Sequence, residues 1–485
     1  MLPIFRNNTG AARKFSEAFA GVHFLYSLFF AVTKPTMPGG FYSEFLPFGE
    51  PWSQSAGITA SFGLDGLTGL LTVFTSFMFL CATALGKSTV KNTDRTFYAL
   101  LTLLFGCTIG IFAAKDMFLF FAYWIAEIVP VYMLTARYGS GKATKSARRY
   151  ALYLITGSML LLCSMSALYC YGFALNGEAG SSIDFLRTDL SDGISSPVVQ
   201  ILMFTGFFAG FGTKIPIIPF HSAITDVLTD APTPVAMMIS ACLIKTGIYG
   251  LIRFNIELFP QIYAFLAPGI MILAVIGIIW AIFCAYGCEN LKRIVAYLSI
   301  AGAGTILLGL CSLTKYGLDG AMFQIFAHGF ATAALILTAG IIAKTYGTTF
   351  LGFLGGIGTS RPLFMLTTYT ACFALVGIPL TAGFPGLFLI FLGCATSDFG
   401  TGMLPVIVTI TAIFAAILTA CCVSKIIHDI FCGKSTHETK KDLNGRNAKF
   451  MIIFCCAAII FGLYPDALFS IVSDVSDEIL TIIAG

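Results

Sequence analysis

Long apolar stretches alternate with short charged or turn-rich connections along almost the whole chain. Helices of about 17 to 25 mostly apolar residues match the thickness of a bilayer core, whereas the strands of a membrane barrel would be shorter and would alternate in polarity. The pattern therefore predicts an all-α polytopic membrane protein with about thirteen transmembrane helices. We place these helices at about 16–33, 66–86, 96–114, 117–136, 150–172, 198–220, 233–252, 261–284, 295–311, 320–343, 362–395, 403–424 and 450–465.

The connections between these stretches alternate in charge. The connection at 137–149 carries five basic residues and no acidic one, whereas the connection at 173–197 carries four acidic residues and one basic one. The residues after 465 include four acidic side chains and no basic one. Because short cytoplasmic loops are enriched in Lys and Arg, an odd number of spans with the N-terminus inside and the C-terminus outside fits this pattern.

Composition supports the same class. Hydrophobic residues make up 57% of the 485 residues and charged residues only 11%, with a mean hydropathy of +0.88, which leaves too few charges to cover a soluble surface. The net charge of +4 reflects the basic connections, and nothing indicates nucleic-acid binding. The 15 cysteines are scattered without Cys-x-x-Cys spacing, so we expect neither a metal nor a redox cofactor in this chain.

Two lysines, Lys214 and Lys245, lie inside predicted spans. An ionisable side chain at bilayer depth costs roughly 2.5 to 3.5 kcal/mol on insertion scales, so it persists where it faces a partner or water. Burial also favours the neutral form of a lysine, which allows the side chain to exchange protons through water. These lysines are the first candidates for an ion pathway. For Lys245, a structural ion pair or a side chain that snorkels to the interface is the alternative interpretation.

Two of the predicted spans contain residues that break helices. Pro216 and Pro219 remove backbone donors beside Lys214, and the segment Gly377–Gly386 contains two prolines and three glycines. Irregular backbone at this depth is tolerated only inside protein or beside a water-filled cavity, and paired broken helices indicate the inverted repeats of a transporter. Proline kinks that serve packing alone are the alternative. We divide the chain into N-terminal helices at 1–95, a first repeat at 96–253, a second repeat at 254–430, and a C-terminal loop, last helix and short tail at 431–485.

A central motif resembles that of the antiporter-like, proton-pumping membrane subunits of respiratory complex I. Its parts are Lys214, Pro216, Pro219, His221, Asp226, Ala231–Val235 and Lys245–Arg253. Further matches to this family are Gly63–Gly66, Asn290–Ser299 and the stretch around His328. The resemblance therefore covers almost the whole chain, and both repeats are expected to be antiporter-like.

Within that family the chain looks most like the chain 4 type, also called subunit M, since only about twenty residues follow the last predicted span. The segment Trp124–Tyr132 is similar to the D-type chain of the photosynthetic NDH complex, which leaves the electron donor open between NADH and ferredoxin. The family has a further helix before its basic segment, whereas only Met1–Phe5 precede Arg6 here. We therefore expect the first family helix to be truncated, missing or supplied by another chain, and we expect no cleaved signal.

The resemblance implies roles for three basic side chains of the interior and a fourth near its edge. Lys214 would be the proton-carrying lysine of the broken helix, and Lys245 its neighbour towards the central axis. His328 would continue that axis into the second repeat, with a merely packed and hydrogen-bonded histidine as the alternative. His221 would lie at the end of the broken helix, where capping of free backbone is its alternative role.

Two carboxylates that are typical of the family are absent. The glutamate directly after the tryptophan would fall on Ile125, and the glutamate of the second broken helix would fall on Leu387. Glu127 matches a second glutamate of the photosynthetic type, but two residues along a helix correspond to about 200° around the axis and about 3 Å along it. We therefore expect Glu127 to replace the missing residue only through water or a side-chain shift. A buried carboxylate that is paired elsewhere is the alternative.

The resemblance implies a membrane-arm subunit of a proton-translocating NADH or ferredoxin:quinone oxidoreductase. Redox catalysis would take place in partner subunits, which would hold quinone, NADH or ferredoxin, flavin and iron–sulfur clusters. The expected partners are other membrane-arm and quinone-module subunits in a bacterial inner membrane, with thylakoid and mitochondrial inner membranes also open. The alternatives are a subunit of a multisubunit cation/proton antiporter and a degenerate structural subunit that pumps no protons.

Overall fold

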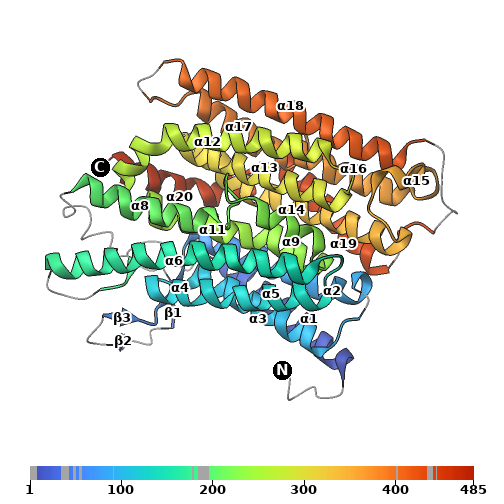
Figure 1. The fold of residues 1–485 in the computed structure, drawn as a ribbon, viewed down its shortest axis with the longest axis horizontal. Helices are drawn as coiled ribbons and strands as arrows, with labels where there is room; N and C mark the ends of the chain where they lie inside the picture. Colours follow the sequence, from blue (N-terminus) through green and yellow to red (C-terminus); the bar gives the residue numbers. More distant parts are fainter. Residues whose placement is uncertain are drawn as a thin grey trace.

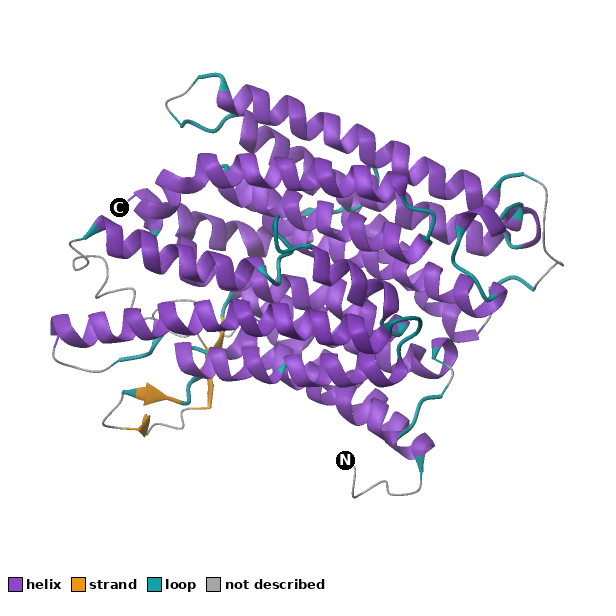
Figure 2. Cartoon of the chain, in the orientation of Figure 1, coloured by secondary structure: helices purple, strands orange, loops and turns teal. Residues whose placement is uncertain are grey.

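The computed structural model describes residues 8–33, 43–46, 51–53, 57–90, 92–176, 180–183, 196–399, 402–433, 441–443 and 445–484. The start of the chain, where the first family helix is expected to be missing, lies outside these ranges, as does most of the acidic connection at 173–197. Helices dominate the described residues, as Figure 2 shows, which confirms the predicted all-α class.

Helices follow one another with short connections throughout the bundle. In the first half they are α1 (Thr9–Thr33), α2 (Gly66–Thr89), α3 (Arg95–Ala113), α4 (Met117–Ala126), α5 (Ile128–Tyr138), α6 (Ala143–Asn176), α8 (Pro197–Gly212), α9 (Ser222–Asp230), α10 (Thr233–Met238) and α11 (Ile244–Gly250). In the second half they are α12 (Pro260–Gly287), α13 (Leu291–Cys311), α14 (Lys315–Tyr346), the 3₁₀ turn η4 (Leu351–Phe353), α15 (Ile357–Ser360), α16 (Pro362–Val376), α17 (Gly383–Ala395), α18 (Leu404–Phe431), α19 (Gly445–Leu463) and α20 (Asp466–Ala484).

Four short strands, which the sequence did not predict, precede α2. Strand β1 (Ser43–Leu46) pairs with β4 (Phe62–Leu64), and β2 (Pro51–Ser53) pairs with β3 (Ile58–Thr59), both antiparallel. The strands lie at one end of the bundle, on the side where α20 and the C-terminus are found (Figure 1).

Ten helices of the described residues are long and apolar enough to cross a membrane. The segments Pro197–Gly212, Pro362–Val376 and Gly383–Ala395 are shorter apolar helices. The chain is therefore a multi-pass membrane protein, while the count of about thirteen spans and the division into two repeats stay predictions. Helix α14 runs through the middle of the bundle and α18 along one edge (Figure 1). The apolar part of α14 is 100% buried and that of α18 only 28%, so the His328 side chain on α14 lies inside the protein.

Both predicted helix breaks are confirmed. Helix α8 ends at Gly212 and α9 begins at Ser222, and the carbonyl of Gly212 accepts a hydrogen bond of 3.2 Å from the amide of Ile217 instead of continuing the helix ladder. The second break separates α16 from α17. Gly377 ends α16 with a φ of 80°, which a residue with a side chain rarely adopts.

A third irregularity was not predicted and lies on the helix that carries Lys245. Two π-helical turns, η2 (Ile239–Leu243) and η3 (Leu251–Ile256), flank α11. A π turn widens the helix and shifts the direction of the side chains that follow it, and such turns are frequent at functional sites. No proline or glycine pattern in Ile239–Leu243 announces this turn.

The basic connections gather at one end of the bundle, which we call the basic end. Arg137 forms an ion pair with Asp94 at 2.8 Å, and Lys344 Nζ donates to the carbonyl of Ser88 at 2.6 Å. Arg446 and Glu17 meet at 2.7 Å at the same end. The basic side chains described at this end are thus held by carboxylates or by a backbone carbonyl.

The predicted short tail after residue 465 is wrong as a description, because Asp466–Ala484 forms helix α20. Its buried positions include Leu468, Val472, Val475 and Ile479, a spacing that places one stripe against the bundle. On its other side, Asp477 pairs with Lys315 at 2.6 Å. Acidic residues stand between the apolar residues in the sequence of α20, so a search for continuous apolar stretches does not find this helix.

Asp94→Ala should destabilise the basic end by about 1 kcal/mol at neutral pH, the usual cost of losing a helix N-cap. Asp94 accepts from the Phe97 amide at 2.9 Å and from the Tyr138 hydroxyl at 2.5 Å. Burial alone would raise the pKa of this carboxyl, but these hydrogen bonds and the Arg137 charge outweigh burial and hold the pKa below its usual range. The stabilisation by the Asp94 carboxylate is therefore present above the pKa that this group has in the unfolded state, and it disappears as pH falls through the pKa of the folded state.

Thermal unfolding of the purified protein in detergent, at neutral and acidic pH, measures this effect. Asp94→Asn is the control, since an asparagine still caps α3 but carries no charge. A difference between the wild-type chain and Asp94→Ala that stays constant down to strongly acidic pH would contradict the assignment.

Candidate functional site

Glu127 and Lys214 form a buried ion pair. Each side chain is 1% exposed, and Lys214 Nζ donates to Glu127 Oε2. The other carboxylate oxygen accepts a hydrogen bond of 2.8 Å from the hydroxyl of Thr108. Lys214 Nζ also lies 3.7 Å from the centre of the Trp124 ring, whose face attracts cations. A buried charge needs a partner and further hydrogen bonds, and this pair has both.

Glu127 reaches Lys214 because it stands at the junction where α4 ends and α5 begins. Its side chain is 1% exposed, whereas that of Ile125 is 36% exposed, so the two positions face opposite ways. The expectation that Glu127 acts only through water or a side-chain shift is therefore wrong, since the carboxylate contacts the lysine directly. Position 125, where the resemblance places a glutamate, does not face the lysine in this protein, and position 127 does.

Lys245 and His328 form a second buried pair, and each is 1% exposed. Lys245 Nζ lies 2.7 Å from His328 Nδ1 and 3.3 Å from the carbonyl of Ser240, in the π turn η2. Two bases that share one hydrogen bond hold one proton more easily than two, because two like charges at this distance repel. The pair can therefore keep a proton on either nitrogen.

The two pairs are neighbours in the packing of the bundle. An added Cβ on Gly247 of α11 would lie 3.2 Å from Lys214 Cβ and 2.8 Å from Ile215, so this helix packs closely on the turn that carries Lys214. Gly247 is two residues from Lys245. The structure thus brings four of the predicted residues, Glu127, Lys214, Lys245 and His328, into one buried region.

His221 and Leu387 lie elsewhere. His221 stands at the start of α9, where its Nε2 accepts a hydrogen bond of 3.2 Å from the indole of Trp280, a side chain that is 52% exposed. Leu387 belongs to α17 and lines a cavity beside His328, and no acidic residue is among those that line it. The second missing carboxylate therefore has no substitute in that cavity.

Sequence comparison decides the family. Residues 114–419 match the model of the family described as "NADH:quinone oxidoreductase/Mrp antiporter, TM". The chain belongs to this family. It is 32% identical over 419 residues to a protein of Trichormus variabilis named NAD(P)H-quinone oxidoreductase chain 4, an alignment that covers 85% of this chain and 76% of the relative. A Nostoc protein of the same name is also 32% identical over 419 residues, with the same coverage.

Solved structures show the same antiporter-like fold. A chain of respiratory complex I from Thermus thermophilus with bound NADH matches with a TM-score of 0.85 and 23% identity, covering 98% of this chain and 96% of that one. A chain of the Mrp complex from Dietzia matches with a TM-score of 0.84 and 18% identity, covering 100% and 96%. At these identities the likeness concerns the fold alone.

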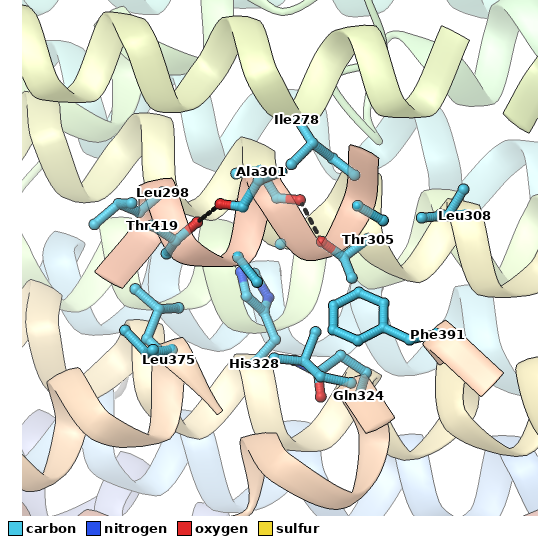
Figure 3. Close-up of a pocket in the computed structure, with 16 residues that line it drawn as sticks. Ile278, Leu298, Ala301, Thr305, Leu308, Gln324, His328, Leu375, Phe391 and Thr419 are labelled. Atoms are coloured by element: carbon cyan, nitrogen blue, oxygen red, sulfur yellow. Dashed lines mark hydrogen bonds between the residues drawn. The ribbon is translucent and has the colours of Figure 1, made fainter. Parts of the chain in front are cut away.

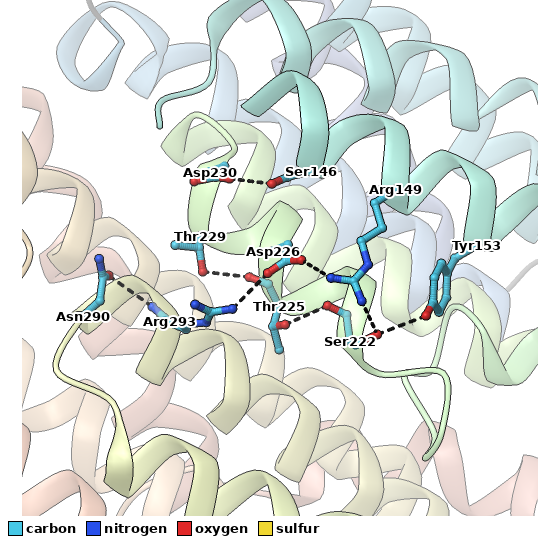
Figure 4. Close-up of polar contacts among 10 residues, drawn as sticks. All are labelled: Ser146, Arg149, Tyr153, Ser222, Thr225, Asp226, Thr229, Asp230, Asn290 and Arg293. Atoms are coloured by element: carbon cyan, nitrogen blue, oxygen red, sulfur yellow. Dashed lines mark hydrogen bonds and ion pairs between the residues drawn. The ribbon is translucent and has the colours of Figure 1, made fainter. Parts of the chain in front are cut away.

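At the basic end of this family member, one carboxylate ties three helices together. Asp226 of α9 accepts from Arg149 of α6 at 2.6 Å and from Arg293 of α13 at 3.0 Å (Figure 4). The hydroxyl of Ser222, also on α9, accepts from Arg149 at 3.1 Å. Helix α9 is the second half of the broken helix and begins next to His221. The cluster therefore holds in place the segment that connects the basic end to the turn carrying Lys214.

Asp226→Ala should loosen α9 more than it destabilises the whole chain. The two arginines are 44% and 46% exposed, so each ion pair is worth at most about 1 kcal/mol, but their loss also leaves two cations facing each other. Hydrogen–deuterium exchange of Ser222–Asp230 should rise about tenfold, which corresponds to about 1.4 kcal/mol of local opening. Asp429→Ala, which removes an acid that pairs with the exposed His428, is the control and should leave α9 unchanged. Equal exchange in both variants would contradict the role of Asp226.

Sequence reasoning missed several polar neighbours of these pairs. Thr108, Ser240 and Gln324 were not singled out, and Trp124 was used only as a motif residue. Gln324 carried a usable signal, since an amide inside a predicted span one helical turn before His328 must find a partner. Thr108 and Ser240 carried none, because small hydroxyl residues in spans usually bond to their own helix.

Proposed function

We propose that this chain is a membrane-arm subunit of a proton-translocating NAD(P)H or ferredoxin:quinone oxidoreductase. The observation that carries the proposal is the row of buried pairs, Glu127 with Lys214 and Lys245 with His328, in a member of this family. An ionisable side chain in the interior of a membrane protein marks an ion pathway by default. Two such pairs on closely packed neighbouring segments support a path rather than a single anchoring ion pair.

The mechanism follows from what each side chain can hold. While Glu127 lies against Lys214, the carboxylate stabilises the ammonium, and the lysine keeps its proton. When Glu127 turns away, or its charge is neutralised, Lys214 is left as an unpaired cation in a dry environment and releases its proton towards Lys245. Lys245 can accept it because its own proton can pass to His328 Nδ1.

In this proposal, energy arrives from redox chemistry in partner subunits as an electrostatic or conformational change that moves Glu127. Such coupling requires that the two states of the Glu127–Lys214 pair differ in their contacts with the rest of the complex. The chain itself carries out no redox step. Quinone, NADH or ferredoxin, flavin and iron–sulfur clusters belong to the partner subunits, and the membrane is a bacterial inner or a thylakoid membrane.

A second candidate is a subunit of a multisubunit cation/proton antiporter, which the likeness to the Mrp chain favours. The same buried pairs would then exchange protons for sodium without an electron donor. The higher identity to proteins named chain 4 supports the redox-driven complex instead.

Purification of the native chain in mild detergent, followed by mass spectrometry of the co-purifying proteins, tests the proposal. We expect quinone-site and iron–sulfur subunits in stoichiometric amounts. Small hydrophobic antiporter subunits in their place, together with sodium-dependent proton flux in vesicles without an electron donor, would show the second candidate to be correct. A redox complex whose proton-to-electron ratio is unchanged by Lys214→Ala would identify a structural subunit.

A further inference from the structure

The ammonium of Lys214 has two neighbours of different chemistry. One is the Glu127 carboxylate, and the other is the face of the Trp124 ring, whose centre lies 3.7 Å from Nζ. An aromatic face attracts a cation within about 6 Å of the ring centre, and more strongly where water is excluded, so this is a close contact. Trp124 is 1% exposed, like the lysine itself. At the other end of the row of pairs His328 borders a cavity instead, and Lys214 is not among the described residues that line it (Figure 3).

A hydrogen bond at its edge holds the Trp124 ring in this direction. Its Nε1 donates to Ser158 Oγ of α6 at 2.9 Å. Ser158, which is also 1% exposed, donates its own hydrogen to the carbonyl of Leu154 at 2.6 Å. The serine therefore presents a lone pair to the indole. Because a buried indole N–H without an acceptor is costly, a tilt of the ring away from Ser158 is disfavoured.

The surroundings of the ring also belong to the segment that carries the lysine. Phe211, three residues before Lys214, stands perpendicular to the Trp124 ring with the ring centres 5.5 Å apart. On α6, Gly157 lies so close to the turn before the lysine that an added Cβ would be 2.4 Å from Thr213 Oγ1. One helix thus packs against both the indole and this turn, which sets where the indole face lies relative to the lysine.

Glu127 and Trp124 reach Lys214 from the same stretch of chain but are held differently. Residues three positions apart share one face of a helix, so both side chains can contact the same ammonium. Glu127 stands at the junction of α4 and α5, whereas Trp124 lies inside α4 with its ring bonded to α6. A movement of the carboxylate at the junction therefore leaves the ring in place.

We propose that Trp124 is a positioning residue, which keeps the Lys214 ammonium in place when Glu127 turns away. Ser158 orients its ring. This inference rests on the proposed function and adds a second group that attracts the ammonium. The indole carries no net charge, so it attracts the ammonium less than the carboxylate does and permits release of the proton. It sets how firmly Lys214 holds that proton and keeps Nζ where the proton passes to Lys245. No bond to Trp124 forms or breaks in the cycle.

Fluorinated tryptophans at position 124 test the ring face alone. One, two or three fluorine atoms on the benzene ring withdraw electron density from the face but leave the shape and the hydrogen bond to Ser158 nearly unchanged. The pH profile of the proton-to-electron ratio is measured in the assembled complex with each analogue. A weaker face lets Lys214 lose its proton at lower pH, so the alkaline fall of the ratio should move stepwise to lower pH, by about one pH unit for three fluorines. Profiles that superimpose would overturn the inference.

Two pairs of variants extend this test. Trp124→Phe and Trp124→Leu both lose the hydrogen bond to Ser158 and much of the volume, but only phenylalanine keeps a ring face, so its alkaline fall should lie closer to the wild type. Ser158→Ala should shift the fall in the same direction as fluorination does. Ser164→Ala, at a serine of α6 that is 6% exposed and packs on Gly206, is the matched control and should change nothing. Equal profiles within each pair would show that packing alone matters and would overturn the inference.

The outcomes separate this inference from the proposed function. If Lys214→Ala lowers the ratio while the fluorinated tryptophans leave its pH profile unchanged, the inference is wrong and the proposed function stands. If Lys214→Ala leaves the ratio unchanged, the proposed function fails, and the position of the ammonium decides the inference by itself. In a cryo-electron microscopy structure of Glu127→Gln, an ammonium within about 6 Å of the Trp124 ring centre supports the inference, and an ammonium turned away from the ring overturns it.

Discussion

Glu127→Gln should lower the proton-to-electron ratio of the assembled complex as far as Lys214→Ala does, and Ile125→Glu should not restore it. A glutamine keeps the shape of the side chain, but it has one acceptor oxygen where Thr108 and Lys214 donate to two, and it leaves the lysine without a counter-charge at a site that is 1% exposed. Removing one partner of a buried ion pair costs about 3 to 5 kcal/mol. That cost corresponds to a fall of more than about a hundredfold in the population of the charged lysine.

Ile125→Glu tests whether contact or mere proximity matters. The family carries its glutamate at this position, but here the side chain is 36% exposed and faces away from Lys214. Proton-to-electron ratios would be compared for Glu127→Gln alone, for Glu127→Gln with Ile125→Glu, and for Glu127→Gln with Ile125→Gln as the uncharged control. If the ratio recovers in Glu127→Gln with Ile125→Glu but not in the uncharged control, the assignment of Glu127 as the direct partner of Lys214 is wrong.

Arg253→Met should cost about 3 to 5 kcal/mol of stability, as much as the loss of Glu127 from its pair with Lys214. The Arg253 side chain is 4% exposed and contacts both Asp65 and Glu257, which are 7% and 1% exposed. Methionine keeps most of the volume but leaves two carboxylates buried without this cation. Asp65 also accepts from the Thr68 amide at 2.7 Å as the N-cap of α2, so the cluster joins the start of α2 to the end of the Lys245-bearing segment.

Thermal unfolding of the purified chain and its recovery in the complex measure this effect. The triple variant Asp65→Asn, Arg253→Met and Glu257→Gln removes all three charges, keeps a capping residue on α2 and should regain most of the lost stability. Arg137→Ala, which breaks a pair whose partners are 57% and 39% exposed, is the control and should cost no more than about 1 kcal/mol. A triple variant that is no more stable than Arg253→Met would show that packing, and not charge, holds this cluster.

Local sequence predicted much of this fold, because a segment that crosses a bilayer has to form a helix with a long apolar surface. Apolar length predicted the helices, and the prolines at 216 and 219 predicted the break beside Lys214. The same rule failed for α20, whose apolar residues form one stripe against the bundle instead of a continuous stretch. It also gave no sign of the π turns around Lys245, since those depend on how the helix packs.

The sequence by itself determined the fold class, the family and the presence of Lys214, Lys245 and His328 inside the protein. An ionisable group in lipid is costly, so an ionisable residue within a long apolar stretch can be recognised from the sequence alone. Only the tertiary structure decided which groups are partners. The direction of Glu127 depends on where α4 ends, and the contact of Lys245 with His328 joins residues 83 positions apart. The energy of an ion pair falls off within a few ångströms, so the spacing of residues along the chain cannot predict which groups pair. The same holds for the cavity beside His328, whose lining comes from several helices.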